Sequence, residues 1–135
     1  MPQLHYFLYH REKVHNGILQ HFVKPVGLNH TLMVVWSPRF FIAEKRFDVK
    51  EAASRTAQQD RLVSKESKEH CSTMVPVKGP LVPKLVQDAC RAIVRHTAAI
   101  SKRGILLSRM VLTFKMDQKE QLWLLWCNSL RFASG

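Results

Sequence analysis

The C-terminal part of the chain, residues 105–132, most constrains the fold, because two apolar runs flank the short polar segment 117–120. Asp117 suits a turn, and the alternation of apolar and polar residues before it is typical of a half-buried strand. This pattern predicts a β-hairpin. One face of its first strand should carry Leu106, Met110, Leu112, Phe114 and Met116.

The second strand of this hairpin, residues 122–127, is apolar on both faces. Its tryptophans, Trp123 and Trp126, stand three positions apart and therefore fall on opposite faces. A central strand that is covered on both sides explains this pattern, so we expect both tryptophans to lie in the core. The alternative is that one face meets a partner, with Trp123 or Trp126 as an interface anchor, since tryptophan is enriched in interfaces.

The N-terminal part predicts an antiparallel meander of three strands. Residues 17–23, 31–36 and 40–47 have strand composition, and Pro25, Gly27 and Pro38 supply the breaks between them. After the third strand, residues 49–78 form a polar connection, which we expect to be mobile or to contain a short surface helix over residues 49–68.

One helix is predicted over residues 83–102, because Pro83 stands at its entrance and Gly104 follows its end. The helical period places one set of residues on a core-facing side: Leu85, Ala89, Ala92, Ile93, His96 and Ile100. His96 is then expected to be a hydrogen-bonded core histidine. The opposite side carries the cations Lys84, Arg91, Arg95 and Lys102.

Together these elements predict an α+β fold, in which an antiparallel sheet made of the meander and the hairpin packs against one main amphipathic helix. The 135 residues and the 46% hydrophobic content suit a single domain spanning residues 1–135. No apolar run approaches the roughly 18 residues that a membrane-spanning helix requires. We therefore expect no transmembrane segment.

The three cysteines Cys71, Cys90 and Cys127 are odd in number and widely spaced. This usage fits reduced thiols in an intracellular protein better than a disulfide framework. The N-terminus also lacks a secretory signal pattern. We expect a cytoplasmic protein that is not secreted, with a ciliary, flagellar or nuclear location as alternatives.

Catalytic and metal-binding patterns are missing from the sequence. His5, His10, His15 and His21 recur every five or six residues, which neither stacks them on a helix face nor matches the ligand pairs of zinc sites. The five glycines form no phosphate-binding loop, and no strained nucleophile turn is present. We expect no catalytic residue, no metal site and no cofactor.

Several segments resemble a conserved, uncharacterised domain of flagellated eukaryotes. They are residues 16–22 (Asn-Gly-Ile-Leu-Gln-His-Phe), the motif Trp36-Ser37-Pro38, and the two hairpin strands at residues 109–117 and 122–131. Such domains are often N-terminal parts of longer proteins, so the resemblance implies a scaffold or interaction role, a ciliary connection, and a chain that is either a short family member or a fragment. It supplies no catalytic residue.

The charge excess is the remaining guide to function. The chain has 21 Lys and Arg against 10 Asp and Glu, a net charge of +11, which favours nucleic acid, an anionic membrane surface or an acidic protein as partner. Our hypothesis is a non-catalytic module that docks an acidic protein surface. An RNA-associated accessory protein that binds the phosphate backbone is the alternative, and a small enzyme with an unrecognised site ranks third. The residues expected to bind are Lys84, Arg91, Arg95 and Lys102, with Trp123 or Trp126 as anchor.

Overall fold

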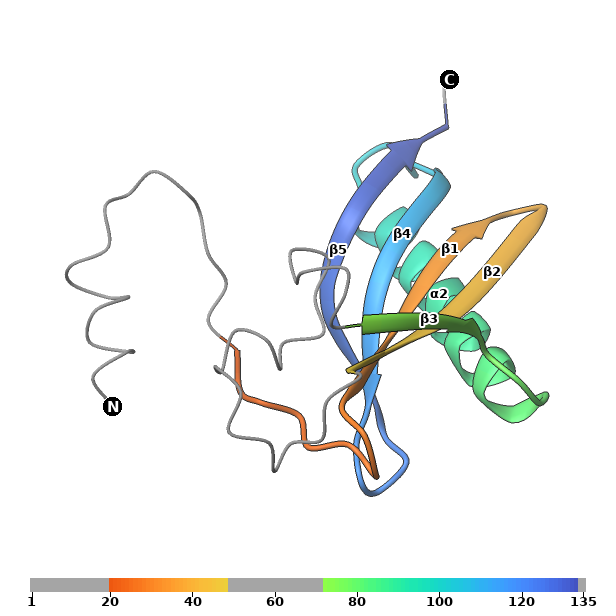
Figure 1. The fold of residues 1–135 in the computed structure, drawn as a ribbon. Coiled ribbons are helices and arrows are strands. Elements are labelled where there is room, and N and C mark those ends of the chain that lie inside the picture. The colour runs from red at the N-terminus through yellow and green to blue at the C-terminus, as the bar shows by residue number, and fades with distance from the viewer. Residues whose placement is uncertain (1–19, 49–71, 134–135) are drawn as a thin grey trace, which may run out of the picture.

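A computed structural model describes residues 20–48 and 72–133, which form a five-stranded antiparallel sheet with one helix packed against it (Figure 1). The elements are β1 (His30–Ser37), β2 (Phe40–Asp48), β3 (Ser72–Pro76), α2 (Leu81–Ile100), β4 (Leu107–Met116) and β5 (Leu122–Phe132). Their order in the sheet is β3-β2-β1-β4-β5, and every neighbouring pair is antiparallel. The α+β prediction is confirmed. No helix in the described ranges is long and apolar enough to cross a membrane.

The N-terminal strands differ from the expected meander. β1 and β2 confirm two of the three predicted strands, but the described part of the first, residues 20–23, belongs to no strand. The third N-terminal strand is instead β3, which lies within the predicted connection 49–78 and pairs with β2. The rest of the predicted first strand, residues 17–19, and most of that connection, residues 49–71, lie outside the described residues.

The helix begins two residues earlier than predicted and ends at Ile100. Gly104 follows with a φ of 59°, a left-handed conformation that glycine adopts without strain. The buried side is centred on Val86 and Cys90, with Val82, Ala89, Ile93 and Val94 packed around them. The predicted core face is confirmed at Ala89 and Ile93. It is wrong at the other four positions, which are exposed: Leu85, Ala92, His96 and Ile100. Apolar residues cover a wide arc of α2, so their period alone does not determine which side of the helix faces the sheet.

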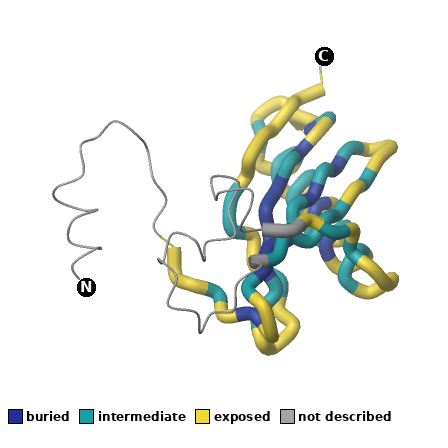
Figure 2. The backbone as a smooth tube through the Cα atoms, viewed as in Figure 1, coloured by how far each residue is buried: buried dark blue, intermediate teal, exposed yellow. Residues whose placement is uncertain are grey.

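The core lies between α2 and one face of the sheet (Figure 2). Its members from the sheet are Leu32, Val34 and Trp36 of β1 and Leu107, Met110, Leu112 and Phe114 of β4. Leu106 was expected here but is exposed. A register shift between Leu107 and Arg109 admits an extra residue into β4, and this bulge places Leu107 in the core instead.

Strand β5 lies at the edge of the sheet and pairs only with β4 among the described strands. The prediction of a central strand with both tryptophans in the core is therefore wrong. Trp123 is 48% exposed and Trp126 is partly exposed. A run that is apolar on both faces indicates burial in most sheets, but here it leaves large apolar side chains at the surface.

Candidate functional site

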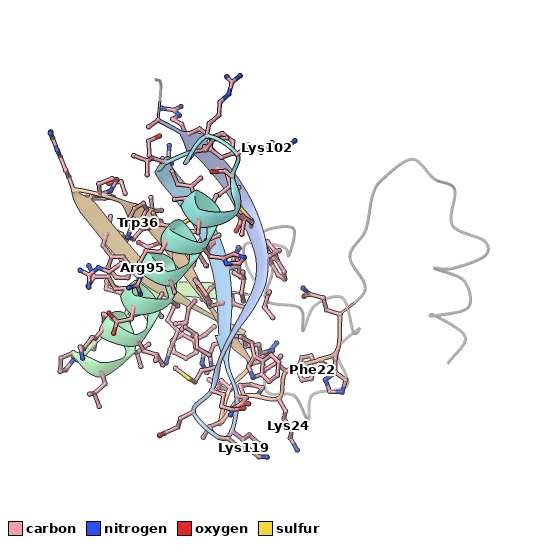
Figure 3. The ribbon with its side chains drawn as sticks, turned by 180° about the vertical axis from the view of Figure 1, so that it is seen from behind. Phe22, Lys24, Trp36, Arg95, Lys102 and Lys119 are labelled. Atoms are coloured by element: carbon pink, nitrogen blue, oxygen red, sulfur yellow. The ribbon has the colours of Figure 1, made fainter. Side chains whose placement is uncertain are left out.

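The exposed side of α2 brings together three of the four cations predicted to bind a partner. Lys84, Arg91 and Arg95 are all exposed, and at about 100° per residue they fall within about 40° of one another around the helix axis. Lys102 lies beyond the end of the helix, and Figure 3 shows it well separated from Arg95 along the molecule. We call Lys84, Arg91 and Arg95 the basic face.

A hollow of about 460 Å³ lies beside the basic face, lined by Trp36, Asp88, Arg91, Val94 and Arg95. Trp36 comes from β1 and is almost buried, so it supplies an apolar wall, and Figure 3 shows it next to Arg95. The hollow therefore combines an apolar lining from Trp36 and Val94 with two guanidinium groups. Such a surface can hold an apolar side chain and contact carboxylates beside it.

The two arginines of the hollow differ in their partners. Arg91 Nη1 lies 3.5 Å from Asp88 Oδ1, and both side chains are more than half exposed, which makes this a weak pair. Arg95 has no acidic partner among residues 20–48 and 72–133. The sequence carries no Asp or Glu from residue 89 to residue 116, so the basic face continues into a long stretch without acidic groups.

Trp123 is held by the loop between β4 and β5. Its Nε1 donates a hydrogen bond of 2.9 Å to Asp117 Oδ2, while Asp117 Oδ1 accepts from the backbone amides of Lys119 and Gln121. The bond from Trp123, followed by the one from Gln121, lowers the pKa of Asp117. Asp117 therefore closes the turn, as the sequence indicated, and its carboxylate is fully engaged.

A second hollow, of about 610 Å³, opens between residues 20–24 and this hairpin loop. Trp123, Leu124 and Leu125 line it from β5, and the side-chain amide of Gln20 donates to the Leu125 carbonyl. Two lysines, Lys24 and Lys119, also line it and lie at the same end of the molecule in Figure 3. No local sequence pattern indicates this hollow, because its two walls are about 100 residues apart in the chain.

The predicted tryptophan anchors and the basic face do not form one site. In the β4–β5 register Trp123 lies opposite Lys115 and Trp126 opposite Thr113, positions that alternate with the core residues Leu112 and Phe114. A register shift between Thr113 and Phe114 admits an extra residue into β5, so both tryptophans point to the face of the sheet that α2 does not cover. The prediction that they fall on opposite faces is therefore wrong. A single flat partner cannot contact them and Arg91 together.

Lys115 is a buried cation that sequence reasoning missed. It is 4% exposed; its Nζ donates a 2.7 Å hydrogen bond to Asn29 Oδ1 and lies 4.1 Å from the centre of the Phe22 ring. Burial lowers the pKa of Lys115 to about 8. In the sequence it resembles a solvent-facing residue of an alternating strand, and only the fold shows that residues 22 and 29 cover it.

The described residues contain no group of three or more His, Cys, Asp or Glu side chains that could hold a metal ion. Cys90 is buried against the sheet, and the loss of water around it raises the pKa of its thiol to about 11, which disfavours the reactive thiolate. Cys127 is exposed and free.

The described residues thus form two hollows, one beside the basic face and one beside Trp123. The first is lined by two of the predicted cations, Arg91 and Arg95, and the second by one predicted anchor, Trp123. Comparison of the chain with protein-family models, with curated proteins and with solved structures finds no match.

Proposed function

We propose that this chain is a non-catalytic interaction module that docks an acidic protein segment on the basic face of α2. The observation that carries the proposal is the hollow in which Arg91 and Arg95 stand beside Trp36 and Val94. An apolar side chain of the partner enters the hollow, and carboxylates next to it pair with the guanidinium groups. Arginine suits this role because its planar fork binds a carboxylate through two parallel hydrogen bonds.

An acidic protein fits this surface better than a nucleic acid backbone does. Phosphate binding requires cations but no apolar lining, and it would use Lys84 and Lys102 as readily as the two arginines. The hollow places an apolar lining beside the two arginines, so a partner can make apolar and ionic contacts at one place. This combination is typical of the centre of a protein interface.

The proposal is tested with fluorescein-labelled peptides that carry glutamates on either side of one leucine or phenylalanine, measured by fluorescence anisotropy. Labelled single- and double-stranded RNA and DNA are measured alongside, at low and near-physiological salt. The test variant is R91E/R95E. The matched control is K24E/K119E, which makes the same change in net charge at the other hollow.

We expect peptide affinity to fall at least about tenfold in R91E/R95E and to change little in K24E/K119E. Equal losses in both variants would mean that the net charge, rather than the basic face, attracts the peptide. Binding of RNA that persists near physiological salt and disappears in R91E/R95E, without peptide binding, would replace this proposal with the RNA-associated function.

A further inference from the structure

Five large apolar side chains are exposed at one end of the molecule, away from both hollows. Each has between 43% and 68% of its surface exposed. They are Ile100, Ile105, Leu106, Leu130 and Phe132, and we call them the apolar patch. Isolated exposed apolar residues are ordinary, but a cluster of five marks a surface that meets something other than water.

The fold brings the members of the patch to one end of the sheet from three elements, with Leu130 and Phe132 on the side of α2 and Leu106 on the other side. The Ile105 amide donates to Ser101 Oγ, which folds the turn after α2 back on the helix end. The Ala133 amide donates to the Leu106 carbonyl, and Leu107 pairs with Phe132 across the hairpin. The end of α2, the start of β4 and the end of β5 therefore meet, near the C-terminus in Figure 1.

The charged residues nearest to the patch along the chain and in the hairpin register are cations. Lys102 and Arg103 lie in the turn after α2, and Arg109 and Arg131 face each other on β4 and β5; all four are exposed. No Asp or Glu occurs in residues 89–116 or 121–135, which include every residue of the patch and of this rim. The segments that carry the patch therefore contribute cations and no carboxylate side chain to this end of the described structure.

We propose that this apolar patch and its cationic rim dock on an anionic lipid bilayer. Apolar side chains inserted among lipid headgroups with Lys and Arg against the anionic lipids form the usual arrangement of a peripheral membrane contact. The patch lines neither of the two hollows, and a fluid bilayer requires no matching pocket. A folded acidic protein would instead be expected at a hollow such as the one beside Arg91. This membrane contact uses different residues from the proposed peptide site and does not depend on it.

The test is flotation of the whole chain with vesicles of phosphatidylcholine alone and with vesicles that contain about 30% phosphatidylserine. Two variants remove the contact: L106S/F132S removes apolar surface, and K102E/R103E reverses part of the rim. Two matched controls lie elsewhere. L81S removes a leucine that is 79% exposed at the start of α2, and K24E/K119E reverses two charges at the second hollow.

We expect binding only to the phosphatidylserine vesicles, with at least about a tenfold loss of partitioning in each test variant and less than about a threefold loss in each control. Circular dichroism checks that all variants are folded. Absence of binding to either vesicle overturns the proposal, as does undiminished binding by L106S/F132S or an equal loss in the controls.

Sedimentation of the chain without vesicles tests whether a second copy of the chain, rather than lipid, occupies the patch. A dimer that forms without lipid and disappears in L106S/F132S would assign the patch to contact between two copies and overturn the membrane proposal. The peptide assay above keeps the two proposals apart, because L106S/F132S should bind the acidic peptide as the unmodified chain does.

Discussion

The two faces of the sheet differ in the kinds of side chains that they bury. One face is covered by α2 and buries the apolar cluster that includes Val34, Met110 and Phe114. The other buries Thr113 and the charged Lys115, and the residues that cover Lys115 come from segment 20–29, which has no helix or strand. Apolar burial stabilises the first face without directional contacts, whereas each polar group on the second needs a specific partner.

The test with the largest expected effect is Phe114→Ala, which removes a fully buried side chain from the core between α2 and the sheet. We expect the free energy of unfolding to fall by about 3–5 kcal/mol, because the substitution loses apolar contacts and leaves a cavity. Chemical denaturation measures the loss. Phe40→Ala is the control, since Phe40 is about half exposed, and a comparable loss there would contradict the assignment of the core to one face.

A second test uses pH, because each face buries one titrating group and the two groups should change the stability of the fold in opposite directions as pH rises. Burial lowers the pKa of Lys115 to about 8 from an ordinary 10.5, so the unfolded chain binds more protons between these values and stability should rise with pH there. Burial raises the pKa of Cys90 to about 11 from an ordinary 9.0, so stability should fall as pH rises through that range.

These opposite slopes are measured as differences between the unmodified chain and Lys115→Met or Cys90→Ala, by denaturation from pH 7 to 11. Each slope should amount to about 1–3 kcal/mol over its range. Slopes of the same sign for the two differences would contradict an arrangement in which one face buries a group that ionises to a cation and the other a group that ionises to an anion.

A third test removes the acceptor of the buried ammonium. Asn29→Ala should cost about 1–3 kcal/mol at neutral pH, because it leaves Lys115 buried without this hydrogen bond. Lys115→Met should cost less, because it removes the charge together with the need for an acceptor. Thermal unfolding of both variants ranks them, and the reverse order would show that Lys115 is hydrated rather than held by Asn29.

The smallest expected effect is at Thr113, whose hydroxyl donates a 2.7 Å hydrogen bond to Asn128 Oδ1. Thr113→Val keeps the shape of the side chain, and the exposed Asn128 can turn to water. We expect a loss of about 0.5–1 kcal/mol in denaturation, clearly below that of Asn29→Ala. A loss above 2 kcal/mol would mean that Thr113 supports more of this face than its one bond suggests.

The sequence predicted the elements with local signals and missed those that depend on distant residues. The hairpin, β1 and β2 follow from alternation and turn residues, and the helix ends follow from Pro83 and Gly104 within two residues. Strand β3 was missed because its five residues follow a polar stretch and pair with β2 across the long connection 49–71 rather than through a tight turn. The cover over Lys115 was missed because Phe22 and Asn29 are far from it in sequence.

In the candidate site, too, the residues with a local signal were predicted and those brought in by the fold were missed. The cations Arg91 and Arg95 are exposed together on one side of α2, as the helical period indicated, since charged side chains rarely leave the surface. Their apolar neighbour Trp36 comes from β1, and no local pattern connects the two. The position of Trp123 and Trp126 depended on whether β5 lies at the centre or at the edge, and composition does not distinguish these places.

The position of β5 at the edge has a consequence for how the protein behaves in concentrated solution. Residues 122–127 (Leu-Trp-Leu-Leu-Trp-Cys) form an uncharged apolar edge with strong β propensity, the type of segment through which sheets of separate molecules join into aggregates. Mutual repulsion between chains of net charge +11 opposes this joining. Since added salt screens such repulsion within about 8 Å at physiological ionic strength, the colloidal stability of this protein should depend on ionic strength far more than its folding does.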